Sequence, residues 1–370
     1  MYSPRVGDPL SALDTPSLLI ELDLMESNIA LMQERLRGTQ ARMRPHLKTA
    51  KCSEIAHMLL KAGAIGGCVS KVSEAEVMAQ AGIEDLLITS EIVGPAKVAR
   101  LVQLVQQHPQ IKVVVDSLVG ASALNQAMQS IQQPLDVLIE IDVGQHRCGV
   151  QPGEAALQLA QQLRSLSFLR LRGVQGYEGH LQHVADAAER ERNCHQSMQL
   201  LTTTAESLRQ GGFPIEIVTT GGTGTAQICA SFPAVTEVQP GSFIFMDADY
   251  LHALGPTYAP SLTVLSTVIS RPASQRAIID AGLKSLSTDS GMAEPKNAPD
   301  LRYSPLGDEH GGLTWDNGYK KNHLEPQIGD CLELIPSHCD TTINLFDTYY
   351  AHRNGKIEAI WPIAARGKVQ

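Results

Sequence analysis

The stretch "GGCVSKVSEAEVMAQAGIEDLLIT" (residues 66–89) has the pattern of a strand, a helix and a second strand. Apolar runs at 66–70 and 85–89 flank residues 73–82, where apolar side chains recur three or four positions apart, as on one face of a helix. The alternation continues along the chain and gives eight candidate strands, at 41–47, 66–70, 85–89, 111–116, 135–142, 169–176, 215–220 and 235–241. Eight such units predict an α/β protein with a (β/α)₈ TIM-type barrel, whereas the alternative, a doubly wound sheet, rarely needs eight.

The pattern changes after Asp249. The runs that follow are strand-like, with little helical periodicity between them, at 260–272, 276–287, 328–337 and 356–365. They predict a second, mostly β domain over residues 255–370, after a barrel domain over residues 14–250. One strand-like run, at 17–23, is surplus to the eight, so we expect residues 1–22 to join the second domain.

Composition argues against several classes of protein. The chain has 370 residues, of which 43% are hydrophobic and 4% aromatic, and its formal net charge is −9. Without basic blocks or many aromatic side chains to stack on bases, binding of nucleic acid is not expected. Membrane insertion is not expected either, because no apolar run reaches the roughly 18 residues of a span, and "MYSPRVGDPL" lacks the pattern of a secretory signal. The seven cysteines are scattered and never spaced C-x-x-C, which indicates reduced thiols in a cytoplasmic protein.

The ends of three candidate strands carry the residues that point to chemistry. In a TIM-type barrel, catalysis occurs at the carboxyl ends of the strands, and the loops after strands seven and eight usually hold phosphate. Here those loops read "TTGGTGT" (219–225) and "QPGS" (239–242), whose glycine N–H groups can approach a phosphate. Each is also compatible with an ordinary tight turn, and Lys48, at the end of the first strand, with a solvated strand-end lysine. An amine and a phosphate cradle at one barrel mouth are, however, what pyridoxal phosphate (PLP) requires.

Six motifs carry a resemblance to a known family: "LDTPSLLIELD" (13–23), "RPHLKTAK" (44–51), "TTGGTGT", "EVQPGSF" (237–243), "DEHGGL" (308–313) and "PSHCDTTINLFD" (336–347). Together they resemble the D-threonine aldolase and D-serine dehydratase group of alanine-racemase-like (fold type III) PLP enzymes. The resemblance covers nearly the whole chain and implies a homodimer with Lys48 as the residue that carries the cofactor. It further implies phosphate contacts at Gly222, Thr223, Gly241 and Ser242, Gln239 at the pyridine nitrogen, Arg147 at the phenolic oxygen, Tyr177 near the ring and His183 as base.

The stretch "PSHCDTT" (336–342) is the candidate metal motif. His338 and Asp340 are two residues apart, so on an extended strand their side chains point the same way while that of Cys339 points away. An imidazole and a carboxylate suit a divalent ion, Mn²⁺ first, with Mg²⁺, Co²⁺ or Zn²⁺ as alternatives. A strand with two solvated polar residues is the ordinary alternative. In the family, His-x-Cys is the pattern of the D-serine dehydratase branch, so His-x-Asp favours the D-threonine aldolase branch.

The resemblance therefore implies a lyase that uses PLP and a divalent metal to cleave D-β-hydroxy-α-amino acids, such as D-threonine, to glycine and an aldehyde. His183 is expected to remove the proton of the substrate β-hydroxyl. A dehydratase acting on D-serine or D-threo-3-hydroxyaspartate is the main alternative. A 3-hydroxy-D-aspartate aldolase and an amino-acid racemase are further ones. PLP-binding homeostasis proteins share the lysine and phosphate features but lack the second domain.

Overall fold

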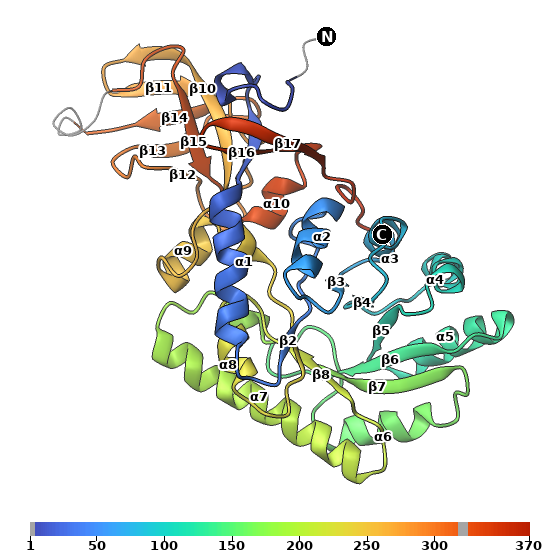
Figure 1. Cartoon of the computed structure of the whole chain (residues 1–370). Helices are drawn as coiled ribbons and strands as arrows, with labels where there is room; N and C mark the ends of the chain where they lie inside the picture. The colour runs from blue at the N-terminus through green and yellow to red at the C-terminus, as the bar shows by residue number, and fades with distance from the viewer. Residues whose placement is uncertain (1–3, 317–324) are drawn as a thin grey trace. The chain divides into compact units, whose positions relative to one another are not determined.

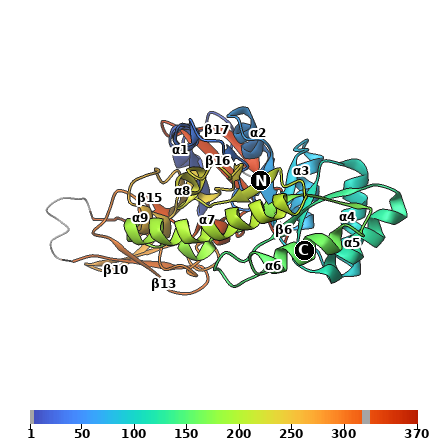
Figure 2. The same cartoon turned by 90° about the horizontal axis from the view of Figure 1, so that it is seen from below.

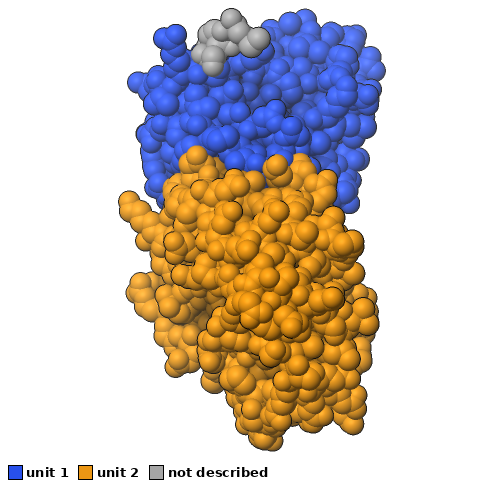
Figure 3. Space-filling view, turned by 90° about the vertical axis from the view of Figure 1, so that its right-hand side faces the viewer, with its two compact units in different colours: residues 1–31, 242–366 blue, residues 32–241, 367–370 orange. Residues whose placement is uncertain are grey.

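The computed structural model describes residues 4–316 and 325–370. The chain forms two compact units, which Figure 3 shows in different colours. We call residues 32–241 with 367–370 the barrel unit, and residues 1–31 with 242–366 the β unit. The sequence predicts domains with the limits 14–250 and 255–370. The two units do not test those limits, which stay a prediction.

The barrel unit contains eight short parallel strands, and all eight strands predicted from the sequence are present. They are β2 (Arg42–Met43), β3 (Gly67–Val69), β4 (Leu86–Ile88), β5 (Lys112–Val115), β6 (Leu135–Glu140), β7 (Leu169–Gln175), β8 (Ile217–Thr220) and β9 (Glu237–Val238) (Figure 1). Each pairs with its neighbour in chain order from β3 to β9, and β9 pairs with β2. A parallel bridge between His46 and Cys68 then joins the chain after β2 to β3, so the predicted barrel is confirmed.

The first strand is shorter than predicted, because β2 ends at Met43 rather than at residue 47. Pro45 lies on the seam between β2 and β3, where its carbonyl oxygen accepts a hydrogen bond from the backbone N–H of Cys68 (2.8 Å). Leu47 continues the pairing by donating to the carbonyl oxygen of Cys68 (2.7 Å). Proline has no N–H to add to the ladder, so pairing persists here while the regular strand does not.

Helices alternate with these strands: α1 (Leu22–Leu36), α2 (Ser53–Lys61), α3 (Val72–Gln80), α4 (Pro95–Gln107), α5 (Leu118–Ile131), α6 (Glu154–Leu163), α7 (Ala187–Gln210) and α8 (Ala226–Ala230). From α3 to α7, consecutive helices pack side by side (Figures 1 and 2). A strand covered by helices in this way can be apolar throughout, as in the fully buried run of β4. Within the described residues, none of the helices has the length and apolar character needed to cross a membrane.

Within the described residues, the β unit is built on nine strands: β1 (Ser17–Glu21), β10 (Leu262–Ala273), β11 (Arg276–Ile279), β12 (Glu294–Pro295), β13 (Arg302–Pro305), β14 (Gly311–Thr314), β15 (Cys331–Ile335), β16 (Thr348–Arg353) and β17 (Lys356–Pro362). Its short helices are η1 (Leu10–Ala12), η3 (Ser242–Ile244), α9 (Ala248–Leu254) and α10 (Cys339–Ile343). The mostly β second unit is thus confirmed. In this sheet β1 lies between β10 and β16, and the expectation that residues 1–22 join the second domain stays a prediction.

A buried ion network crosses the seam of the barrel. Arg44, which is 2% exposed, donates two hydrogen bonds of 2.8 Å to the carboxylate of Glu237 and one of 2.7 Å to Asp85. Lys112 donates to Asp85 as well (2.7 Å). Burial alone would lower the pKa of Arg44, but the hydrogen bonds and charge of Glu237, with those of Asp85, raise it above its usual value, so the guanidinium is ionised. Gly66 makes room for this group, because a Cβ there would lie 2.5 Å from Nη1 of Arg44.

We expect Arg44→Met to lower the free energy of unfolding by about 3–5 kcal/mol, because it leaves the carboxylate of Glu237 buried without its cation. The measurement is urea denaturation, with Arg37→Met as the control. Arg37 pairs with Glu34 on the surface, where such pairs contribute roughly 0–1 kcal/mol. Adding Glu237→Met to Arg44→Met should recover much of the loss, because the orphaned charge is then removed. An Arg44→Met protein as stable as the Arg37→Met control would contradict this account.

Candidate active site

Lys48 lies in the turn that follows the seam, at the carboxyl end of the β2 segment. The turn is anchored to the loop after β9, since His46 N–H donates to the carbonyl oxygen of Pro240 (3.0 Å). Lys48 is half-buried. The nearby Lys51 is engaged differently, because its ammonium is buried and bonded to Glu74 (2.5 Å). The ammonium of Lys51 is therefore committed to an ion pair, and Lys48 stays the candidate predicted from the sequence.

Thr49 and Gly241 bring the lysine turn and the loop after β9 into contact. Thr49 is 1% exposed, and its hydroxyl oxygen has no hydrogen-bond partner within the described residues. A Cβ on Gly241 would lie 2.8 Å from that oxygen. Buried hydroxyls are normally hydrogen-bonded, so this one points to a ligand with polar atoms. The cradle fits a phosphate or another polar part of PLP beside Lys48.

The glycine-rich segment at the end of β8, residues 219–225, is hydrogen-bonded to Glu178. This glutamate is 0% exposed, and it accepts hydrogen bonds from the hydroxyls of Thr220 (2.8 Å) and Thr225 (2.5 Å). The backbone N–H of Gly221 (3.4 Å) and the amide nitrogen of Gln182 (3.2 Å) also donate to it. Four donors facing one buried carboxylate leave the loop little freedom.

Gln182 explains why the loop needs its glycines. The side-chain oxygen of Gln182 accepts from the N–H of Gly224 (2.9 Å), and a Cβ on Gly222 would lie 2.4 Å from the same oxygen. A Cβ on Gly224 would lie 2.6 Å from the backbone oxygen of Gln182. Thr223, between these glycines, is buried. The loop thus packs against the segment after β7 at a distance that only glycine permits.

Gln239 belongs to a buried hydrogen-bond chain across the ends of β6, β7 and β8. Its side-chain nitrogen donates to Gln175 (2.9 Å) and Thr219 (2.7 Å), and Gln175 in turn donates to Glu140 (2.5 Å). Burial, with the nearby charge of Glu91, raises the pKa of Glu140 well above its usual value. Since both N–H groups of Gln239 are used, its carbonyl oxygen is the atom that can meet a ligand.

Of the remaining residues predicted from the sequence, Arg147 and His183 are exposed, Tyr177 is half-buried and Ser242 is buried. Arg147 is exposed, and its guanidinium carbon lies 5.7 Å from the ring centroid of the half-buried Tyr177. His183 is exposed, just after η2 (Gly179–Leu181). Ser242, next to Gly241 in the chain, is the first residue of η3 and belongs to the β unit.

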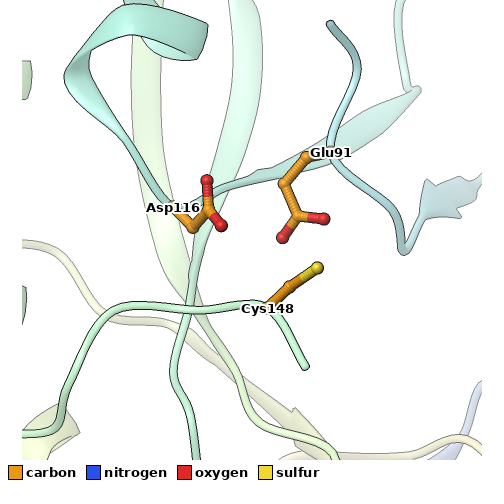
Figure 4. Close-up of side chains that lie close together, drawn as sticks. All are labelled: Glu91, Asp116 and Cys148. Carbon is orange, nitrogen blue, oxygen red and sulfur yellow. The ribbon is translucent and has the colours of Figure 1, made fainter. Parts of the chain in front are cut away.

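A group that the sequence did not single out lies at the ends of β4 and β5. Glu91, Asp116 and Cys148 have side-chain oxygen or sulfur atoms within 4.8 Å of one another (Figure 4). Burial and the hydrogen bond to Glu91 raise the pKa of the Cys148 thiol to about 11. The thiol therefore keeps its proton at neutral pH, hydrogen-bonded to Glu91 with Asp116 nearby.

In the β unit, the metal motif is not the extended strand predicted from the sequence, and that expectation is wrong. His338 has extended backbone angles but precedes α10, and Asp340 lies in the first turn of that helix. The chain turns after His338, whose carbonyl oxygen accepts from Thr342 N–H (3.3 Å). Cys339 is fully buried, and its thiol donates to the carbonyl oxygen of Met246 (3.4 Å). The thiol is thus held in the core, away from any ligand.

His338 is oriented by Asp289, which precedes β12. The Nδ1 atom of His338 lies 2.7 Å from Oδ2 of Asp289, and Oδ1 of Asp289 accepts from the hydroxyls of Ser287 (2.6 Å) and Thr341 (2.7 Å). Burial opposes ionisation of Asp289, but the hydrogen bonds from Ser287, His338 and Thr341 lower its pKa to about 2. Nε2 of His338 and the carboxylate of Asp340 remain as nitrogen and oxygen donors, a set that suits Mn²⁺, Mg²⁺, Co²⁺ or Zn²⁺.

Sequence reasoning missed the residues that organise these groups, chiefly Glu178, Gln182, Thr49 and Asp289. Glu178 lies within "GYEGHLQH" (176–183), and a glutamate between two glycines after a barrel strand was the available signal. Thr49 follows Lys48 directly. Asp289 had no local signal, because it lies 49 residues from His338.

Comparison with known proteins places both units in recognised families. Residues 20–249 match the family described as alanine racemase, N-terminal domain, and residues 261–352 match the putative serine dehydratase domain. The chain is 43% identical over 364 residues to the D-threonine aldolase of Arthrobacter sp., which covers 98% of this chain and 95% of that protein.

Two solved structures are similar over almost the whole chain. The D-threonine aldolase from Filomicrobium marinum is 38% identical, with a TM-score of 0.95 and full coverage of both chains. A D-threo-3-hydroxyaspartate dehydratase, solved as a cysteine-to-alanine mutant in a metal-free form, is 30% identical with a TM-score of 0.86. That likeness covers 96% of this chain and 98% of the dehydratase.

We expect Glu178→Gln to loosen the glycine-rich loop, because an amide cannot accept all the hydrogen bonds that the carboxylate accepts. Leaving buried donors unpaired costs about 1–3 kcal/mol, which should speed amide hydrogen exchange in residues 219–225 roughly tenfold or more. The matched control is Glu191→Gln, an exposed glutamate on α7. Equal exchange rates in the two variants would show that Glu178 does not hold the loop.

Proposed function

The chain belongs to the alanine-racemase-like family of PLP enzymes that includes the D-threonine aldolases, and we propose that it cleaves D-β-hydroxy-α-amino acids to glycine and an aldehyde. D-Threonine is the first substrate to consider, since relatives along the full length of the chain are D-threonine aldolases. The reaction needs a residue that carries the cofactor, a base for the β-hydroxyl proton and groups that bind a divalent metal.

One observation favours the aldolase over the dehydratase: the metal motif offers an imidazole and a carboxylate, not a thiolate. Cys339 sits between His338 and Asp340, but its buried thiol has a pKa raised well above the usual value by burial and by the charge of Asp247. The thiol also donates to the carbonyl oxygen of Met246 in the core (3.4 Å), which supports a metal site without sulfur. Two protein ligands leave the other positions of a six-coordinate ion to water and substrate.

PLP fits the barrel mouth, and this supports the assignment of Lys48 as its carrier. When bound, the cofactor supplies an aldehyde that links to an amine and a ring that takes up the electrons of the broken bond. Thr49 has a buried hydroxyl without a hydrogen-bond partner in the described residues, and the backbone of Gly241 lies close to that hydroxyl. We assign the phosphate contacts to Gly222, Thr223, Gly241 and Ser242, as the family resemblance implies.

The other proposed contacts orient the ring. Gln239 would accept a hydrogen bond from the pyridine nitrogen in its protonated form, because its own N–H groups are donated to Gln175 and Thr219. Arg147 and Tyr177 form a cation–π pair that we propose lies against the phenolic oxygen and the ring.

Two groups would handle the substrate hydroxyl. A divalent ion held by His338 and Asp340 would act as a Lewis acid that lowers the pKa of a nearby hydroxyl. His183, whose exposed imidazole can reach solvent, is proposed to take up the hydroxyl proton and release it to water. An amino-acid racemase would leave the His338–Asp340 pair without a role, and a PLP homeostasis protein would not need the β unit.

We further propose a cytoplasmic homodimer with Mn²⁺ as the metal. The cysteines within the described residues are free, and five of the seven are buried, which is consistent with a reducing compartment. An N/O donor pair without sulfur suits Mn²⁺ better than a thiolate-rich site would.

The decisive test is the product formed from D-threonine by the purified protein supplied with PLP and Mn²⁺. We expect glycine and acetaldehyde in equal amounts, with L-threonine left unchanged. If 2-oxobutyrate and ammonia predominate, the protein is a dehydratase and the aldolase proposal is wrong. D-threo-3-hydroxyaspartate, assayed in parallel, separates preference for a methyl substituent from preference for a carboxylate.

The metal pair is tested in the same assay. His338→Ala and Asp340→Ala should each lower cleavage at least about a hundredfold, the order expected when a catalytic ion is lost, while keeping the visible absorption of bound PLP. Asp300→Ala, an exposed aspartate of the same unit, is the matched control. Wild-type activity in both metal-pair variants would refute the assigned role.

A further inference from the structure

Asp289 occupies a defined place beside the proposed metal ligand His338. It reaches His338 from the segment between β11 and β12, across 49 residues of sequence. The contact joins Oδ2 of Asp289 to Nδ1 of His338 at 2.7 Å, the length of a strong charge-assisted hydrogen bond. Nε2 is the imidazole nitrogen on the other side of the ring.

Asp289 is itself fixed on both sides. Its second carboxylate oxygen accepts from Ser287, in its own segment, and from Thr341, in the first turn of α10. Thr341 follows Asp340 directly in the sequence. The carboxylate of Asp289 is therefore hydrogen-bonded both to His338 and to the neighbour of Asp340, the two residues proposed to hold the ion. The aspartate cannot rotate to serve as a ligand without breaking these hydrogen bonds.

The chemistry of the pair dictates which nitrogen carries the proton. An ionised carboxylate only accepts hydrogen bonds, so Nδ1 of His338 must be the donor. A neutral imidazole protonated on Nδ1 has its lone pair on Nε2, and that lone pair is what a divalent ion requires. Carboxylate partners of this kind commonly orient histidine ligands and raise their basicity.

We propose that Asp289 is a positioning residue that locks His338 in the tautomer able to bind the metal through Nε2. This inference rests on the proposed function only in that His338 is a metal ligand. It assigns to Asp289 no contact with the ion or the substrate. Ser287 and Thr341 act one step further away, by holding the carboxylate of Asp289 in line with the imidazole.

The test is binding of Mn²⁺ alone to the full-length protein after treatment with a chelator, measured by calorimetry. Asp289→Ala should weaken Mn²⁺ binding by about 10–100-fold, the usual effect of removing such a partner, with the absorption of bound PLP and the thermal midpoint little changed. Asp300→Ala is the control and should bind as the wild type does. Equal affinity in Asp289→Ala and Asp300→Ala would overturn the proposal.

His338→Ala separates this proposal from the proposed function. If His338→Ala leaves the affinity for Mn²⁺ unchanged, His338 is not a ligand. The proposed metal site and the proposal for Asp289 then fail together. If His338→Ala abolishes binding while Asp289→Ala does not weaken it, the proposal for Asp289 fails alone.

The tautomer is measured directly, without any variant, by ¹⁵N NMR of histidine-labelled metal-free protein, with the His338 signal identified by its absence in His338→Ala. A proton on Nδ1 is the expected result. A proton on Nε2 with Nδ1 bare would overturn the proposal, even if Asp289→Ala proved too unstable to purify. In a folded Asp289→Ala protein, a shift toward the Nε2-protonated form would show that Asp289 sets the tautomer rather than only supporting the loop.

Discussion

The bidentate contact between Arg44 and Glu237 is the constraint on which the barrel mouth depends. It joins β2 to β9, while the contact of Arg44 with Asp85 reaches across to the strand that follows β3. Those connections hold the seam where Pro45 interrupts regular pairing. Lys48 lies four residues beyond Arg44, so a shift of the seam would move the lysine as well. A buried ion pair adds little net stability over an apolar pair, and its value here is the fixed register of the seam.

The candidate active-site residues are held mostly by buried acids and amides that accept hydrogen bonds, with the exposed Asp289 as the exception. Glu178 gathers the glycine-rich loop, and Glu140 ends the chain of amides that orients Gln239. In the β unit, Asp247 accepts the backbone N–H at the start of α10, and Asp289 accepts from His338. Supporting residues that are themselves buried and bonded keep a reactive site within the narrow geometry that catalysis needs.

The sequence predicted the barrel well because strands such as β4 and β5 are largely buried and appear as short apolar runs between helical segments. It also predicted that the loops after the first and the eighth strand lie at one edge of the barrel, where Thr49 and Gly241 are in close contact. Partners distant in sequence could not be predicted in this way: Glu178 meets Thr225 across 47 residues, and no periodicity marks either one. The start of α10 was mistaken for a strand because a five-residue helix is too short to show a helical period. The family resemblance supplied the roles of the site residues, which composition and spacing do not give.

The central claim is that Lys48 carries the cofactor, and one measurement tests it most directly. Borohydride reduction of the protein loaded with PLP converts the bond between lysine and cofactor into a stable pyridoxyl-lysine, which peptide mapping then locates. We predict a single adduct, on Lys48. An adduct on Lys51, whose ammonium is already bonded to Glu74, or on any other lysine would contradict the account.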